Sequence, residues 1–164
     1  LGMLGLQTLS LNGRQASRHL GYGKLIKDVA GILDLPADFN YKIIGRRGDK
    51  MSDGFFLPDK PDGMATFHGS CKEEVILVRN HEINPRVSGV SGPFGKNNQL
   101  AKNLSAKNIY DRGRSSPCLG GTTTVVYNLK SQKVIRQFLS LVGTLRNCAG
   151  GQLRGGLGSH VRKP

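Results

Sequence analysis

The chain has 164 residues and a formal net charge of +13. A charge this positive favours anionic partners, but the basic residues are scattered and no aromatic side chains alternate with them, which argues against a specific reader of nucleic acid. The three cysteines form no C-x-x-C pair, so zinc-ribbon and thioredoxin sites have no support, and no stretch is long and apolar enough to span a bilayer.

The first 20 residues are predicted to be a peripheral segment. Residues 1–11 are apolar with small side chains, which is typical of the end of a signal-peptide apolar region but also of a short amphipathic helix. Residues 21–35 read as a loop with one or two short turns, and Pro36 ends that loop. The chain is therefore expected to begin its folded core after Pro36.

Short β-branched and apolar runs follow, separated by turn-forming residues. Strands are predicted at residues 41–45, 75–78, 122–127 and 134–142, and the run 75–78 is apolar enough to be buried on both faces. Residues 59–63 contain Pro and Gly in a turn pattern, residues 128–133 suggest a hairpin, and residues 84–111 form a long polar loop. This succession predicts a mainly β protein, either a sandwich, a barrel or a propeller.

Polar residues at the ends of two predicted strands are the candidates for chemistry. Asn80, His81 and Glu82 follow a buried strand, where oxygen and imidazole donors suit a metal or phosphate site, although composition alone favours a plain polar strand end that enters a loop. Cys148 lies between Asn147 and small residues, so it is open to a role as metal ligand or nucleophile, or is a buried structural cysteine. The glycines before the Thr-rich strand at 122–127 suit phosphate contacts or a simple turn.

The order of these motifs resembles the N-terminal part of the PhoX alkaline phosphatase family. The resemblance covers residues 21–151, and its most specific segments are Arg-Asn-His-Glu at 79–82 and Asn-Cys-Ala-Gly-Gly at 147–151. The other segments that carry it are Gly-Tyr-Gly at 21–23, Gly-Ile-Leu-Asp-Leu-Pro at 31–36, Phe-Asn-Tyr at 39–41, Asp-Gly at 53–54, Asp-Gly-Met at 62–64 and Gly-Gly-Thr-Thr-Thr at 120–124.

The resemblance implies a fold, an activity and a set of ligands. The fold would be a partial β-propeller, made of early blades with an irregular N-terminal segment and long loops. The activity would be hydrolysis of phosphate monoesters with iron and calcium ions, in a monomeric protein exported by the twin-arginine route to the periplasm or beyond. Cys148 would be an iron ligand, Glu82 with Asn80 or His81 would complete the metal site, and a phosphate clamp or a structural ion pair would use Arg79 or Arg146.

The sequence departs from the family after Gly151. Residues 152–164 lack the Trp and the acidic residue that the family carries there, and codons read one base earlier can encode the family's pattern. The sequence therefore predicts three parts: residues 1–20, a propeller part at 21–151 and a frameshifted tail at 152–164. A chain without the downstream acidic ligands is expected to be an inactive fragment.

Two other functions are compatible with the residues alone. The first is a small basic module that binds anions or nucleic acid without catalysis, which needs the positive charge to gather on one face. The second is a non-catalytic, propeller-like interaction protein in which Cys148 is merely buried.

Overall fold

The computed structural model describes residues 21–84, 91–114, 116–152 and 158–162. The chain divides into two compact units, Leu1–Ile43 and Ile44–Pro164. The predicted signal-peptide segment at residues 1–20 lies outside the described residues. In the part of the chain that is described, no helix has the length and apolar character needed to cross a membrane.

The described part of the first unit is a loop organised by one aspartate. The Asp28 carboxylate accepts hydrogen bonds from the backbone N–H groups of Ala30, Ile32 and Leu33. It also accepts one from the Tyr41 hydroxyl at 2.6 Å. The Tyr41 bond is the largest of the causes that lower the pKa of Asp28 to about 2. The predicted loop at 21–35 is confirmed.

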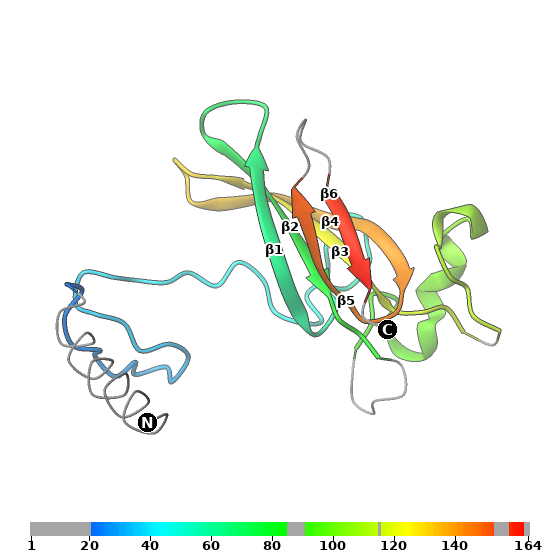
Figure 1. The fold of residues 1–164 in the computed structure, drawn as a ribbon, viewed down its shortest axis with the longest axis horizontal. Coiled ribbons are helices and arrows are strands. Elements are labelled where there is room, and N and C mark those ends of the chain that lie inside the picture. Colours follow the sequence, from blue (N-terminus) through cyan, green and yellow to red (C-terminus); the bar gives the residue numbers. More distant parts are fainter. Residues whose placement is uncertain (1–20, 85–90, 115, 153–157, 163–164) are drawn as a thin grey trace, which may run out of the picture. The chain divides into compact units, whose positions relative to one another are not determined.

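The second unit is built on one antiparallel sheet of four strands in sequence order (Figure 1). The strands are β1 (Pro61–His68), β2 (Glu74–His81), β3 (Gly120–Asn128) and β4 (Lys133–Thr144). Two further strands, β5 (Asn147–Gln152) and β6 (Gly158–Arg162), pair as a second antiparallel sheet. The predicted mainly β class is confirmed, and the four-stranded sheet is open rather than closed.

Three of the predicted strands are present, and the hairpin between β3 and β4 is as expected. Threonine and valine fill the central strand β3, where β-branched side chains pack well against neighbours on both sides. Its residues from Gly120 to Val126 are all buried, and β2 and β4 pair with its two edges. The loop predicted from residue 84 to 111 holds two short 3-10 helices, η1 (Lys96–Asn103) and η2 (Ala106–Asn108).

Two predictions about local structure are wrong. Residues 41–45 form no strand, because no neighbouring segment pairs with them and the chain turns directly afterwards, where Asp49 N–H donates to the Arg46 carbonyl at 3.0 Å. Residues 59–63 were expected to be a turn, but β1 begins at Pro61. The register of β1 against β2 shifts between Pro61 and Met64, so the turn-like Asp-Gly pair is accommodated as an irregularity inside a strand.

The apolar core lies between the loops and the β4 side of the sheet. Its buried residues are Met51, Phe55, Leu57, Phe94, Ile109 and Val142. The rings of Phe55 and Phe94 meet edge to face with centroids 5.9 Å apart. The loop that supplies Phe55 is tied to β4, since Ser52 N–H donates to the Gln137 carbonyl at 2.8 Å and the Asp53 carboxylate accepts from Leu139 N–H at 2.7 Å. The loop at residues 51–57 is therefore attached to β4 by hydrogen bonds and by the shared apolar core.

Part of the predicted tail takes regular structure. The backbone of β6 pairs with β5 from Asn147↔Arg162 to Gln152↔Gly158. Residues 153–157 and 163–164 lie outside the described residues.

Candidate functional site

The C-terminal end of β2 and the start of β5 lie next to each other. Asn147 Nδ2 donates a hydrogen bond to Asn80 Oδ1, although the two residues are 67 positions apart in the sequence. The same Nδ2 donates to the Gly121 carbonyl at 3.2 Å, and Arg146 N–H donates to the Ile83 carbonyl at 3.1 Å. The structure therefore brings together the two segments, 79–82 and 147–151, that the sequence singled out separately.

Close backbone contacts hold β5 against the sheet. Asn80 Nδ2 donates to the Gly63 carbonyl at 2.6 Å. A Cβ atom on Gly63 would lie 2.9 Å from the Cys148 carbonyl oxygen and 3.0 Å from Ala149 Cβ, so only glycine lets β1 approach β5 this closely. This contact fixes the backbone of Cys148, whose side chain is half-buried.

Two side-chain oxygen atoms lack hydrogen-bond partners at the corner where the end of β2 meets the start of β5. Asn147 is fully buried, and its Oδ1 accepts no hydrogen bond from any described residue. Thr144 Oγ1 is likewise buried without a partner. A Cβ atom on Gly120 would lie 3.1 Å from Thr144 Oγ1 and 3.1 Å from the His81 carbonyl oxygen, which places these oxygens around one glycine. Buried acceptors of this kind are uncommon and suit a site that receives a cation or a water molecule.

His81 uses both ring nitrogens inside the protein. Nδ1 lies 3.0 Å from the Asp59 carbonyl oxygen and Nε2 lies 2.9 Å from Thr123 Oγ1. A carbonyl oxygen only accepts, so Nδ1 carries the proton and the Thr123 hydroxyl donates to Nε2. Burial, with a smaller effect from the nearby Arg79 charge, lowers the pKa of His81 to about 4. The imidazole is therefore neutral at physiological pH and is held in one tautomer.

Arg79 also contacts Thr123, the hydroxyl partner of His81. Its Nε donates to Thr123 Oγ1 at 3.3 Å, while its Nη2 is buried without a hydrogen-bond partner. Burial lowers the pKa of this guanidinium from its usual value. The ion pair that the described residues contain joins Arg47 to Asp59 and does not involve Arg79. Arg79 therefore carries a buried charge that no described carboxylate balances, a situation that proteins usually resolve with an anion.

The stability of the chain is expected to fall in mild acid because of His81. With an unfolded pKa of 6.5 and a folded pKa of about 4, the folded state resists protonation. The associated stability is complete above pH 6.5 and is lost as the pH falls toward 4, by about 3 kcal/mol in total. Urea unfolding at a series of pH values measures this change. The variant His81→Gln is expected to lose the dependence in this range, and an unchanged dependence would show that another group causes it.

The remaining predicted residues lie at the edge of this corner. Glu82 is half-buried directly after β2, and Arg146 is exposed in the turn before β5. Arg146 has a positive φ of 51°, an unusual backbone conformation for a residue with a side chain and one that is often found at functional sites. Within the described ranges, no group of three His, Cys, Asp or Glu side chains lies close enough to hold a metal ion.

Sequence reasoning missed the residues that join the two segments. Asn147 and Thr123 form the polar contacts of the corner, and Gly63 makes the close approach possible. Asn147 belongs to the quoted Asn-Cys-Ala-Gly-Gly segment, so its position beside Cys148 was the available signal. Thr123 belongs to the quoted Gly-Gly-Thr-Thr-Thr segment at 120–124, but nothing in the sequence indicated that it would contact His81.

The structure shows a mainly β protein in which the end of β2 and the start of β5 bring amide and hydroxyl groups together, with Glu82 and Cys148 next to them in the sequence. Such a mixture of donors is typical of metal-assisted chemistry on anionic substrates. The chain belongs to the PhoX family of alkaline phosphatases, because the family model "Alkaline phosphatase PhoX" matches residues 20–154. The family is one of metal-dependent phosphatases, which act on phosphate esters. Neither a curated protein nor a solved structure matches the chain.

Proposed function

We propose that the corner formed by β2 and β5 is part of the metal site of a phosphomonoesterase that uses iron and calcium ions. The hydrogen bond between Asn147 and Asn80 is the observation that carries this proposal, because it unites the two most specific family segments. The family match supports phosphatase chemistry. In this proposal Cys148 is an iron ligand, and Glu82 and Asn80 supply oxygen donors.

The residues of the corner fit these ions chemically. A thiolate suits iron, and carboxylate and amide oxygens suit calcium. The buried Asn147 Oδ1, which has no partner among the described residues, is a further oxygen donor of the required kind. When bound, the ions would offset the charge of the phosphate and activate an oxygen nucleophile.

The predicted roles of His81, Arg79 and Arg146 differ in how well the geometry supports them. His81 already engages both ring nitrogens, so we assign it to positioning Thr123 and the end of β2 rather than to metal binding. Arg146 is exposed beside Cys148, so it is better placed than the buried Arg79 to clamp a phosphate. Arg79 then acts through Thr123 and not by touching the substrate.

We further propose that β1 to β4 form one blade of a propeller. A blade is a four-stranded antiparallel sheet with its strands in sequence order, which is the arrangement of β1–β4. The same proposal includes twin-arginine export to the periplasm and a monomeric state. It also includes the division of the chain at residues 20 and 151. Determining the DNA sequence across codon 151 tests the proposed frameshift, which an intact reading frame would rule out.

Cys148→Ser is expected to weaken iron binding by the purified chain. The chain is loaded with iron and calcium, dialysed, and its metal content measured; loss of a thiolate ligand is expected to weaken iron binding at least about tenfold. Cys71→Ser is the matched control, because Cys71 is an exposed thiol that precedes β2. Equal iron retention by both variants would contradict the assignment of Cys148.

Hydrolysis of p-nitrophenyl phosphate by the same samples tests the reaction itself. The family resemblance places further acidic ligands after Gly151, so the chain alone is expected to turn over little substrate. Strong turnover that depends on the added metal and on Cys148 would support the phosphatase assignment and contradict the expected inactivity. Turnover equal in wild type and Cys148→Ser would contradict the assigned site.

A further inference from the structure

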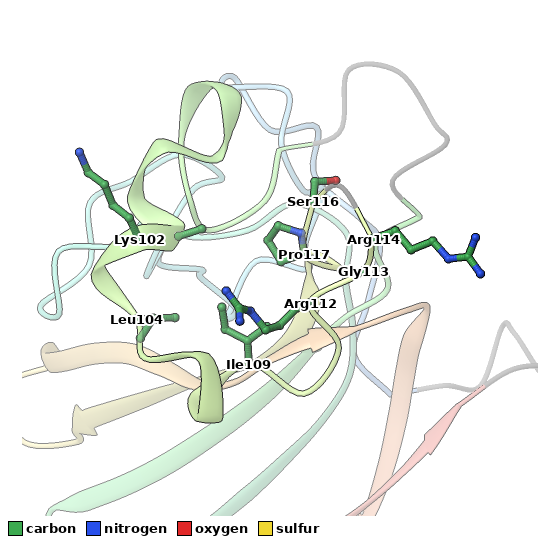
Figure 2. Close-up of a pocket in the computed structure, with 9 residues that line it drawn as sticks. Lys102, Leu104, Ile109, Arg112, Gly113, Arg114, Ser116 and Pro117 are labelled. Carbon is green, nitrogen blue, oxygen red and sulfur yellow. The ribbon is translucent and has the colours of Figure 1, made fainter.

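We propose that a pocket beside the two 3-10 helices binds an organic phosphate or phosphonate with an apolar body, independently of the metal site. The pocket has a volume of about 650 Å³ (Figure 2). This volume lies within the range of small-molecule sites. Its lining residues are Ala101, Lys102, Leu104, Ile109, Arg112, Gly113, Arg114, Ser116 and Pro117.

The part of the pocket lining next to the core is apolar and well anchored. Ile109 belongs to the buried core, and Ala101 and Leu104 pack against that core. The following residue is tied to β4, since Tyr110 N–H donates to the Val142 carbonyl at 3.0 Å. A lining built on the core is largely pre-formed, so a ligand loses little binding free energy in ordering it.

The charged lining of the pocket is entirely cationic. Lys102, Arg112 and Arg114 contribute to it, and no acidic side chain does. The nearest acidic residue in the sequence, Asp111, uses its carboxylate to accept a hydrogen bond from Gly113 N–H at 2.8 Å. The local charge therefore favours an anionic ligand.

Arg112 is the residue that can contact such a ligand directly. Figure 2 shows its guanidinium group beside Ile109 and between Leu104 and Pro117, whereas Lys102 and Arg114 extend away from the pocket. A guanidinium binds a phosphate or phosphonate through two parallel hydrogen bonds. The apolar side chains around it would then contact the organic part of the ligand, and the two outer cations would add a weaker, longer-range attraction.

This combination favours an organic phosphate over the simpler anions. Inorganic phosphate would pair with Arg112 but would leave the apolar part of the lining in contact with water. A nucleic acid strand is bound mainly through a row of cations and stacked aromatic rings, and the pocket lining contains no aromatic residue. An apolar ring or chain joined to one phosphoryl or phosphonyl group matches both parts of the pocket.

Binding of 1-naphthylphosphonate, which a phosphatase cannot hydrolyse, tests the proposal by isothermal titration calorimetry. We expect it to bind the full chain more tightly than either inorganic phosphate or the uncharged 1-naphthalenemethanol. Arg112→Ala is expected to weaken this binding at least about tenfold, because hydrogen bonds to charged groups are lost. Lys130→Ala removes the same charge from the exposed turn between β3 and β4 and is expected to change nothing.

Two further measurements distinguish binding at this pocket from binding at the proposed metal site. Binding is expected to persist in the presence of a metal chelator and in Cys148→Ser. Loss of binding in either arm would place the ligand at the metal site and overturn the inference, while leaving the proposed function intact. Equal affinity of wild type and Arg112→Ala, or equal weakening by Lys130→Ala, would also overturn it.

Discussion

Gly121→Ala is expected to lower the free energy of unfolding by at least about 3 kcal/mol. A Cβ atom at this position would lie 2.0 Å from the backbone carbonyl oxygen of Leu141 and 2.9 Å from Val142 Cα. Backbone atoms cannot move aside as a flexible side chain can, so β3 and β4 must separate at the site where Gly121 also accepts from Asn147. Urea unfolding followed by circular dichroism measures the loss.

The matched control is Gly21→Ala. No heavy atom lies within 4 Å of the Cβ position at Gly21, and its backbone is not left-handed, so a change within about 0.5 kcal/mol is expected. If Gly121→Ala were as stable as wild type, the close pairing of β3 and β4 at this residue would be contradicted.

Asn147→Ala is expected to destabilise the chain by about 3 kcal/mol and to weaken iron binding as well. The substitution removes the donor to two acceptors, Asn80 Oδ1 and the Gly121 carbonyl, in a fully buried place. A buried acceptor left without a partner costs about 1 to 3 kcal/mol. Because Asn147 joins β5 to β2, its loss is also expected to displace Cys148 relative to Asn80.

Urea unfolding and the iron content after dialysis measure the two effects of Asn147→Ala. Asn108→Ala, which changes an exposed residue of η2, serves as the control and is expected to leave both quantities unchanged. Stability and iron binding equal to those of the control would show that the junction of β2 and β5 does not depend on this amide.

The strands that the sequence predicted well are those with continuous β-branched runs. Residues 75–78 and 122–127 lie inside β2 and β3, where local preference and burial agree. The strand β1 was missed because its first residues resemble a turn, and only pairing with β2 makes them extended. Conversely, residues 41–45 have strand-like composition but no partner, so the local preference had no effect.

The sequence indicated the two segments of the candidate site, but it did not indicate that they contact each other. Asn80 was predicted to follow a strand that ends at residue 78, but β2 continues to His81, so Asn80 lies inside β2, and Cys148 is the second residue of β5. The contact between their segments spans 67 residues and depends on the order of strands in the sheet, which no local pattern contains. The hydrogen bonds from the His81 ring to the Asp59 carbonyl and the Thr123 hydroxyl likewise depend on long-range packing, so they could not be predicted from the sequence.

Three of the basic residues that are scattered along the sequence line a single pocket in the structure. Lys102, Arg112 and Arg114 are separated along the chain, yet they line one pocket because the loop returns to β4. We propose that this pocket is also where the alternative function predicted from composition, a basic module that binds anions, would be located. Its occupant is expected to be a small organic phosphate and not a nucleic acid.

The X-ray absorption spectrum of iron bound to the chain tests most directly whether the corner of β2 and β5 is a metal site. We expect sulfur among the first neighbours of iron in the wild type and in Cys71→Ser, and only oxygen or nitrogen in Cys148→Ser. Spectra without sulfur in the wild type, or with sulfur retained in Cys148→Ser, would contradict the proposed role of this corner.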